Sequence, residues 1–246
     1  MQKNNKDSYT IRTVEKALSI LEAISEVSGN FRVSQLSDKL GMDKSYVYRV
    51  LATFEKHGYV QHVTDSNKYC TGPMAYETGS KFLHQMQLLQ KAKPIMESVA
   101  QETAEAVYLV IPISNDVLFL EFVDSPQQVR VMPLVGKRFP LQQVSAGKVI
   151  QAHNKPQSQM LSRDQGISRQ EDFVDHGLVG AGIGSLSVPI LDVQQFAVAS
   201  FSLIAPDFRL SHERIEQSLM ETLLDAGRQL SEKLGYFNAK LFQKCF

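Results

Sequence analysis

The sequence predicts an α+β protein with three parts: a small, mainly helical head in residues 1–72, a helix in residues 73–88, and a larger body of strands and helices in residues 89–246. Two observations predict this organisation. Apolar residues in the head recur at intervals of three and four, which is the spacing of one helix face. In the body, short apolar runs rich in Val, Ile and Phe are bounded by polar turns, which is typical of strands.

Composition limits the classes of protein to which the chain can belong. It has 246 residues, of which 43% are hydrophobic and 21% charged, and this suits a globular protein. Its apolar runs are too short to span a bilayer, and its first residues lack the apolar segment of a signal peptide. We therefore expect a cytoplasmic protein with no membrane partner. Cys70 and Cys245 are far apart and form no CxxC pair, which argues against a metal site or a structural disulfide.

Charge gives only a weak indication of the partner. The whole chain carries 26 Lys and Arg against 26 Asp and Glu, and the head alone carries 10 against 8. The small positive excess of the head has the sign expected for a DNA-binding segment. Any electrostatic footprint for a nucleic acid must nevertheless be a local patch.

The first two helices of the head are marked by their apolar positions and by the glycines that follow them. Gly29 and Gly41 each end a helical repeat, and Ser34 is placed to cap the second helix. Leu36 and Leu40 face inward on that second helix. The apolar stripe of the first helix consists of Val14, Ala17, Leu18, Leu21, Ile24 and Val27.

The segment that follows Asp43, its expected N-cap, predicts a third helix with two different faces. One face is apolar at helical spacing and can hold the helix onto a core: Val47, Val50, Leu51 and Phe54. The opposite face is polar and partly basic: Ser45, Tyr48, Arg49, Ala52, Thr53 and Lys56. Taken alone, such a face is more often the solvated side of a helix than a binding surface.

The sequence after the third helix favours the binding surface. Past Gly58, the β-prone runs "YVQHV" and "KYCTG" flank the polar turn "TDSN", which predicts a hairpin. Helix, helix, turn, helix and two-stranded wing is the order of a winged helix-turn-helix domain, whose third helix enters the major groove while the wing touches backbone. The candidate DNA contacts are Arg12, Lys44, Ser45, Tyr46, Tyr48, Arg49, Thr53 and Lys68.

The body is predicted to contain antiparallel hairpins with helices packed on a face of the sheet. A linker helix near Met74–Gln87 and a second helix near Leu89–Thr103, with Pro94 inside it, lead into the body. The predicted strands are "AVYLVIPI", "VLFLEFV", "VRVMPLV", "SLSVPIL" and "FAVASFSLIA"; Pro189 suggests an irregular or edge position. "SAGKVIQAH" is helix-prone, and a long closing helix begins after Ser211.

Several motifs that suggest enzymes or cofactors lack the context they require. The glycines of "GLVGAGIGS" precede a strand, whereas a dinucleotide fingerprint needs a strand before and a helix after. "SAGKV" lacks the remainder of a phosphate loop. The six histidines have no metal-ligand spacing, and Ser145 has no evident His/Asp partners. We therefore predict no enzyme, no cofactor and no metal, although side chains brought together by folding could still form a catalytic cluster.

The chain resembles IclR-type bacterial transcriptional regulators. "TVEKALSILEAI", "VSQLSDKLGMDKSYVYRVLATFEKHGYV" and "KYCTGPMAYETG" are similar to the DNA-binding domain of the family, and "GKRFPLQQVSAGKV", "GIGSLSVPIL" and "SFSLIAP" to its effector-binding domain. The resemblance covers about residues 12–235. It implies a winged-helix head, a linker helix and a GAF-like α/β effector domain. It also implies a homodimer, often paired into a tetramer, on palindromic double-stranded DNA operators.

The resemblance also implies a site for a small organic effector in the body. Matching the family motifs gives Val131, Ser145, Ala146, Asp175, Ile183, Ser185, Ser202 and Ile204. Free N–H groups at a helix start and serine hydroxyls suit a carboxylate, whereas Asp175 prefers a hydroxyl or amine of the same ligand. The alternative is an ordinary core with small residues. This chain has Gly184-Ser185 where many members carry Arg-Cys, and it has Ile204 where a small polar residue is frequent. Because of these departures, the resemblance does not identify the ligand.

Two further alternatives concern the body and the end of the chain. The body is either a ligand-controlled domain or an interaction module whose cavity is filled by side chains. The tail, residues 235–246, extends past the usual family end and places Phe237, Leu241, Phe242 and Phe246 on one helix side. We expect it to dock on its own body or on a partner subunit; the alternative is a frayed terminus.

Overall fold

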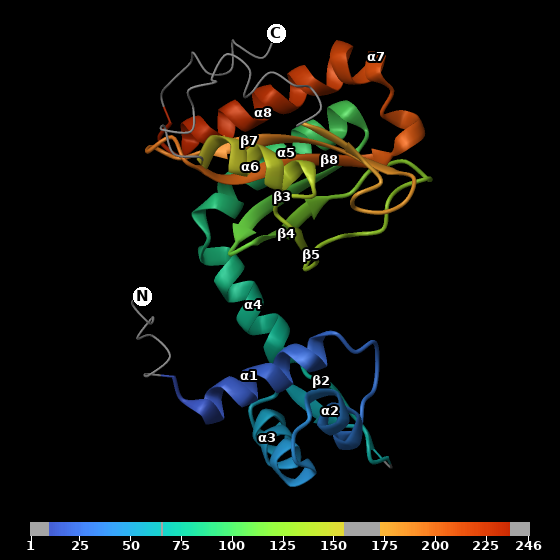
Figure 1. Ribbon diagram of the computed structural model, residues 1–246, viewed down its shortest axis with the longest axis vertical. Coiled ribbons are helices and arrows are strands. Elements are labelled where there is room, and N and C mark those ends of the chain that lie inside the picture. Colours follow the sequence, from blue (N-terminus) through green and yellow to red (C-terminus); the bar gives the residue numbers. More distant parts are fainter. Residues whose placement is uncertain (1–9, 65, 155–172, 237–246) are drawn as a thin grey trace, which may run out of the picture. The chain divides into compact units, whose positions relative to one another are not determined.

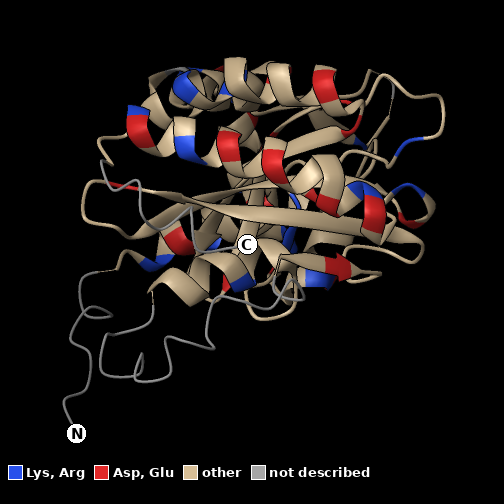
Figure 2. Cartoon of the chain, turned by 90° about the horizontal axis from the view of Figure 1, so that it is seen from above, with Lys and Arg blue, Asp and Glu red and all other residues tan. Residues whose placement is uncertain are grey.

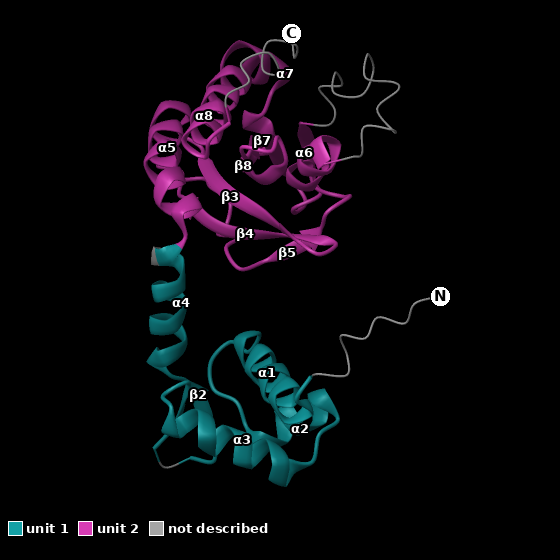
Figure 3. Cartoon of the chain, turned by 90° about the vertical axis from the view of Figure 1, so that its left-hand side faces the viewer, with its two compact units in different colours: residues 1–85 teal, residues 86–246 magenta. Residues whose placement is uncertain are grey.

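A computed structural model describes residues 10–64, 66–154 and 173–236. The chain divides into two compact units, unit 1 (Met1–Gln85) and unit 2 (Met86–Phe246), shown in different colours in Figure 3. The division falls between helix α4 (Pro73–Gln85) and helix α5 (Gln87–Thr103). The boundaries predicted at residues 72 and 88 stay predictions.

Unit 1 has the predicted order of three helices followed by a hairpin. Its elements are α1 (Arg12–Ser25), α2 (Val33–Leu40), α3 (Lys44–Lys56), β1 (Val60–His62), β2 (Tyr69–Thr71) and then α4 (Figure 1). The two strands pair antiparallel, with Gln61 opposite Cys70. One apolar core joins the first three helices and the two strands. Its buried members are Ile20, Ala23, Ile24, Phe31, Leu36, Val47, Leu51, Val60 and Tyr69.

Two details of the predicted head are wrong. On α1, Ile24 of the predicted stripe is buried, but so are Ile20 and Ala23, whereas Val14 and Leu18 are 50% and 53% exposed. The buried face of α1 is therefore rotated from the predicted stripe, and apolar side chains lie on two sides. Ser34 does not cap α2, because the backbone N–H of Arg32 donates to the Gln35 side chain at 2.8 Å and the helix begins before Ser34.

Unit 2 is built on one antiparallel sheet of six described strands in the order β5-β4-β3-β8-β7-β6. Helix α6 (Ser145–Asn154) covers one face, while α5 and α8 (Met220–Lys233) pack together on the other (Figures 1 and 3). The predicted α+β layering is confirmed. The strands are β3 (Ala106–Ile113), β4 (Asp116–Val123), β5 (Arg138–Pro140), β6 (Val174–His176), β7 (Ile183–Leu191) and β8 (Ala197–Pro206).

The predicted strand "VRVMPLV" is wrong. Val131 and Leu134 are buried three residues apart, whereas Val129 and Met132 are 60% and 81% exposed. This burial does not alternate as a strand requires. The segment forms a loop with no strand assignment, and the neighbouring strand β5 was missed. Strands β5 and β6 have three residues each, too few to give a readable period.

The remaining elements of unit 2 follow the prediction closely. Ser211 caps the closing helix through its hydroxyl, which accepts from the Arg214 N–H. The helix then runs through α7 (His212–Arg214), a π turn (Ile215–Leu219) and α8. Pro94 lies inside α5, and Pro189 on β7 lies beyond the last pairing with β6. Within the described ranges, no helix has the length and apolar character needed to cross a membrane.

Candidate functional site

Helix α3 presents the predicted polar face to solvent because its opposite face is fixed to the core. The side chain of Asp43 caps the helix, with Oδ1 accepting from the N–H groups of Ser45 at 2.8 Å and Tyr46 at 3.2 Å. These backbone hydrogen bonds lower the pKa of the Asp43 carboxyl. Val47 and Leu51 are fully buried. The residues left exposed on α3 include Lys44, Ser45, Tyr48, Arg49 and Thr53.

The residues predicted to contact DNA differ in their exposure and in the contacts that they already make within unit 1. Tyr46 is half-buried; its hydroxyl donates to the Thr13 carbonyl at 3.2 Å, and Lys16 Nζ lies 5.5 Å from the centre of its ring. Tyr46 therefore connects α3 to α1. Arg12 is exposed at the start of α1, whereas Lys68 is half-buried in the turn before β2. The Thr53 hydroxyl donates to the Arg49 carbonyl at 3.0 Å.

We expect Tyr46→Phe to lower the free energy of unfolding of unit 1 by about 0.5–1 kcal/mol, because it removes the exposed hydrogen bond to Thr13. Denaturant unfolding of the full chain, followed by a signal from the head, measures the change. Tyr48→Phe is the matched control, since Tyr48 is 56% exposed and no hydrogen bond of its hydroxyl is found in the described chain. Equal unfolding midpoints for the two variants would contradict the structural role of Tyr46.

The predicted effector residues meet on the face of the sheet that α6 covers. The strand register places Asp175 opposite Ser185, Ser185 opposite Ile204, and Ser187 opposite Ser202. Ser145 and Ala146 begin α6 above this row. All of these residues except the partly buried Ile183 have buried side chains; Val131 reaches the same region from its loop.

Five polar side chains of this face form one continuous chain of hydrogen bonds. Asp175 Oδ2 accepts from the Ser145 N–H at 2.8 Å and from the Ser185 hydroxyl at 2.6 Å. The Ser145 hydroxyl oxygen lies 2.7 Å from those of Ser185 and Ser187. Ser187 Oγ lies 2.8 Å from Ser202 Oγ. The five residues are at most 4% exposed. We call Asp175, Ser185, Ser145, Ser187 and Ser202 the serine chain.

The start of α6 is not free in the way that the sequence suggested. The N–H of Ser145 was expected to be open to a ligand carboxylate, but it donates to the carboxylate of Asp175. A helix N-terminus favours a negative charge, and the protein supplies that charge itself. Gly147, in the same turn, is required by packing, because a Cβ there would lie 1.9 Å from the Leu141 carbonyl oxygen.

The apolar candidates belong to a core cluster beside the serine chain. Val131, Ala146 and Ile204 are buried in one cluster with Tyr108, and Ile183 packs against it. The Tyr108 ring lies 5.3 Å from that of Phe122 and 5.5 Å from that of Phe119, between ring centres. Burial raises the pKa of Tyr108 to about 12, against a smaller lowering by the nearby Leu134 backbone.

Sequence reasoning missed Ser187, Ser200 and Tyr108. All three point to the face under α6, because they alternate with residues of the opposite face along β7, β8 and β3. The signal was present as "SLS" and "SFS", in which serines recur with the period of a strand. Ser200 Oγ and Asp175 Oδ1 are buried without a hydrogen-bonding partner in the described chain.

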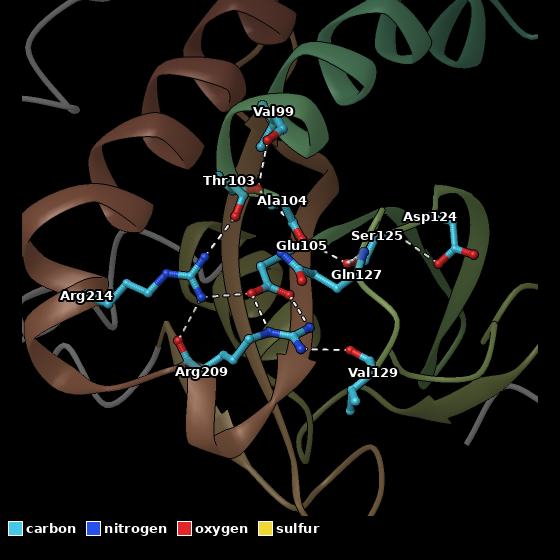
Figure 4. A network of polar contacts seen from close by, with 10 residues as sticks. All are labelled: Val99, Thr103, Ala104, Glu105, Asp124, Ser125, Gln127, Val129, Arg209 and Arg214. Carbon is cyan, nitrogen blue, oxygen red and sulfur yellow. Dashed lines mark hydrogen bonds and ion pairs between the residues drawn. The ribbon is translucent and has the colours of Figure 1, made fainter.

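A second polar network, also unpredicted, holds the loop that carries Val131. Glu105 Oε1 and Oε2 accept from Nε and Nη2 of Arg209 at 2.8 and 2.6 Å, and Oε1 accepts from Arg214 at 2.7 Å (Figure 4). Arg209 also donates to the Val129 carbonyl at 2.7 Å. The Glu105 side chain is 1% exposed. The network therefore joins the start of β3, the segment after β8 and the loop that leads to Val131.

Two further hollows lie on the described part of unit 2. A furrow of about 380 Å³ between α5 and the closing helix is lined by Glu102, Glu221 and Asp225 among uncharged residues. Asp and Glu recur along the helices that Figure 2 shows from above, with Lys and Arg between them. A second, open pocket of about 540 Å³ at the sheet edge is lined by Asp175, Lys148, His176 and His212 with apolar residues. Across the described chain, no group of three or more His, Cys, Asp or Glu residues is placed to hold a metal ion.

Known proteins are similar to this chain over nearly its whole length. HTH-type transcriptional regulator BhcR of Paracoccus denitrificans is 27% identical over 249 residues, covering 92% of this chain and 88% of that protein. HTH-type transcriptional regulator KdgR of Escherichia coli is 25% identical over 259 residues, covering 94% and 96%. These relatives are transcriptional regulators and not enzymes.

Solved structures have the same fold. The Thermotoga maritima IclR structure matches with a TM-score of 0.71 and 23% identity, covering 92% of this chain and 100% of that one. An IclR homologue of Microbacterium hydrocarbonoxydans, crystallised in complex with 4-hydroxybenzoate, matches with a TM-score of 0.73 and 21% identity, covering 91% and 99%.

Two family descriptions match the chain in the order that the fold requires. Residues 13–64 match "IclR helix-turn-helix domain", and residues 80–165 match "Bacterial transcriptional regulator IclR C-terminal". The first range begins in α1 and ends after β1, and the second begins in α4 and ends beyond α6. The chain therefore belongs to the IclR family of DNA-binding bacterial transcriptional regulators.

Proposed function

We propose that two copies of the chain bind a palindromic double-stranded DNA operator through α3, and that a small organic ligand bound beneath α6 controls this binding. The observation that carries the first part is the exposed polar face of α3 opposite the buried Val47 and Leu51. A protein that regulates transcription in this way works in the cytoplasm of a bacterium.

In this proposal, α3 enters the major groove and Arg49 reaches a base edge. Arginine is suited to this role because its guanidinium can donate two hydrogen bonds to guanine. The exposed Lys44 and Arg12, with Lys68 of the wing, contact phosphates and fix the position of the head on the DNA. Ser45, Tyr48 and Thr53 complete the contact surface, whereas Tyr46 acts through the position of α3.

The proposed ligand site is the region of the serine chain and the adjoining Val131, Ala146, Ile183 and Ile204. The related protein crystallised with 4-hydroxybenzoate supports a small organic ligand, and the sequence suggests a carboxylate on it. Because Asp175 already accepts from the Ser145 N–H, that donor is not open to a ligand carboxylate. A ligand alters operator binding only if it binds two arrangements of the heads with different affinity.

Selection of bound sequences from random DNA tests the proposal, followed by a screen of small organic compounds on the resulting complex at fixed salt. We expect a palindromic sequence and at least one compound that changes its affinity. Failure to enrich any sequence would contradict operator binding. Enrichment of an operator whose affinity no compound changes would support the alternative of an interaction module without a ligand.

The assembly is proposed to use the exposed apolar side of α1. Ile11, Val14 and Leu18 are 67%, 50% and 53% exposed within unit 1, and contact with a second copy would remove them from water. We expect Leu18→Glu to shift the chain toward monomers in sedimentation, with Glu22→Gln, on the same helix, as the control. The tail prediction, with Phe237, Leu241, Phe242 and Phe246, lies outside the described residues.

A further inference from the structure

The serine chain contains enough hydrogen bonds to fix the direction of each of them. A serine hydroxyl has one proton to donate and two lone pairs to accept with. Ser185 donates its proton to Asp175 Oδ2. In the contact between Ser145 and Ser185, the donor must therefore be Ser145.

The same count continues to the end of the chain. Since the proton of Ser145 is used on Ser185, the contact between Ser187 and Ser145 must be donated by Ser187. The contact between Ser202 and Ser187 must then be donated by Ser202. Every hydroxyl proton points toward Asp175. Ser202 then has only lone pairs to offer a ligand. Both ends of the serine chain therefore present acceptors: Ser202 Oγ at one end and the unpartnered Asp175 Oδ1 at the other.

The charges on the sheet face under α6 also disfavour a ligand carboxylate. The sheet residues under α6 are, apart from Asp175, uncharged: Ala106, Tyr108, Val110, Val117, Phe119, Ile183, Ser185, Ser187, Ser200, Ser202 and Ile204. No lysine or arginine of the described strands faces them. A carboxylate placed against the serines would meet the Asp175 carboxylate and lone pairs. Lys148 of α6 lines the open pocket at the sheet edge together with Asp175, but none of the four serines lines that pocket.

The buried atoms without partners indicate that this face accepts an added group. Buried polar groups in native proteins are almost always hydrogen-bonded, to the protein, to water or to a ligand. Asp175 Oδ1 and Ser200 Oγ, from side chains at most 4% exposed, lie in two cross-strand rows of one face, on either side of the row that holds Ser187 and Ser202. Asp175 also lines the open pocket of about 540 Å³ at the sheet edge.

We propose that the serine chain selects ligands by hydrogen-bond donors: a ligand group that meets Asp175 Oδ1 at one end, or Ser202 Oγ at the other, is a hydroxyl or an ammonium, and not a carboxylate. This inference rests on the proposed ligand site and specifies its chemistry. Apolar parts of the same ligand lie against Val131, Ala146 and Ile204, which are buried beside the chain. Any acidic group of the ligand lies away from the serine chain.

Three probes that differ only in one polar group test the inference: benzyl alcohol, benzylamine and benzoate. Each is titrated against the full-length chain by calorimetry and ligand-observed NMR at millimolar concentration. We expect the alcohol or the amine to bind at least about tenfold more tightly than benzoate, because a hydrogen bond to a charged acceptor is worth about that factor or more. The alcohol and amine arms distinguish a hydroxyl from an ammonium. Tighter binding of benzoate, or no binding of any probe, would overturn the inference.

Two variants change the direction of the hydrogen bonds. In Asp175→Asn the amide oxygen still accepts from Ser145 and Ser185, but the amide nitrogen, a donor, replaces the free acceptor. The affinity for benzoate relative to the alcohol and the amine should therefore rise by at least about tenfold. In Ser187→Ala, the Ser202 hydroxyl loses its acceptor and can donate its proton to a ligand. The relative affinity for benzoate should therefore rise in this variant too. Ser231→Ala is the control, since it removes a buried hydroxyl on α8 and should leave the order unchanged.

An unchanged order in both folded variants would overturn the inference. Operator affinity, measured in parallel, separates this inference from the proposed function. If benzoate binds most tightly and changes operator affinity, the inference fails while ligand control stands. If the predicted order is found but no probe or screened compound changes operator affinity, the chemistry of the site stands and ligand control fails.

Discussion

Replacing Glu105 by alanine should lower the free energy of unfolding of unit 2 by about 3 kcal/mol, a large loss for a single substitution. The carboxylate is 1% exposed and accepts charge-assisted hydrogen bonds from both Arg209 and Arg214. Removing one partner of a buried ion pair typically costs about 3–5 kcal/mol, because the remaining charge is buried without compensation. Arg209 and Arg214 keep some contact with water, which favours the lower end of that range.

Denaturant unfolding of the full chain with a probe in unit 2 measures this loss. Glu97→Ala is the matched control: it removes an exposed glutamate from α5 and should change the free energy by less than about 0.5 kcal/mol. Arg209→Met should cost less than Glu105→Ala, because Arg214 still pairs with Glu105. Equal costs for Glu105→Ala and Glu97→Ala would show that the network contributes no net stability.

Replacing Arg49 by alanine is expected to weaken specific operator binding by about 1–3 kcal/mol, which is roughly 5- to 150-fold. The loss should be greatest for the operator and small for unrelated DNA, because a base contact distinguishes sequences. Folding should be unaffected, since Arg49 is exposed and lies opposite the buried Val47 and Leu51. Titration of selected operator DNA at fixed salt measures the loss.

Salt dependence separates the base contact of Arg49 from phosphate contacts. Arg12→Ala and Lys68→Ala should weaken binding to all sequences alike and reduce the slope of log affinity against log salt by about one each. Arg228→Ala, which removes an exposed arginine of unit 2, is the control for net charge and should change neither property. Arg49→Ala with unchanged operator preference would remove Arg49 from base recognition.

The sequence predicted the architecture well wherever a long periodic pattern or a side-chain cap decides the local structure. The α3 faces follow from Val47 and Leu51 at helical spacing, and the Asp43 cap is where the pattern required it. It failed where the signal is short or ambiguous. Three-residue strands such as β5 have no readable period, and the apolar run from Val129 reads as a strand although the Val129 carbonyl is held by Arg209.

By itself, the sequence determined the order of elements, the polar face of α3 and the residue types available for a ligand site, because helical and strand periodicities act over neighbouring residues. Only the tertiary structure decided which polar groups satisfy each other. Asp175 and Ser145 are 30 residues apart, and Glu105 and Arg209 are 104 apart, so no local pattern links them. Strand register and the packing of α6 bring these groups within hydrogen-bonding distance. That is why the start of α6, which local reasoning left open for a ligand carboxylate, is occupied by a carboxylate of the protein.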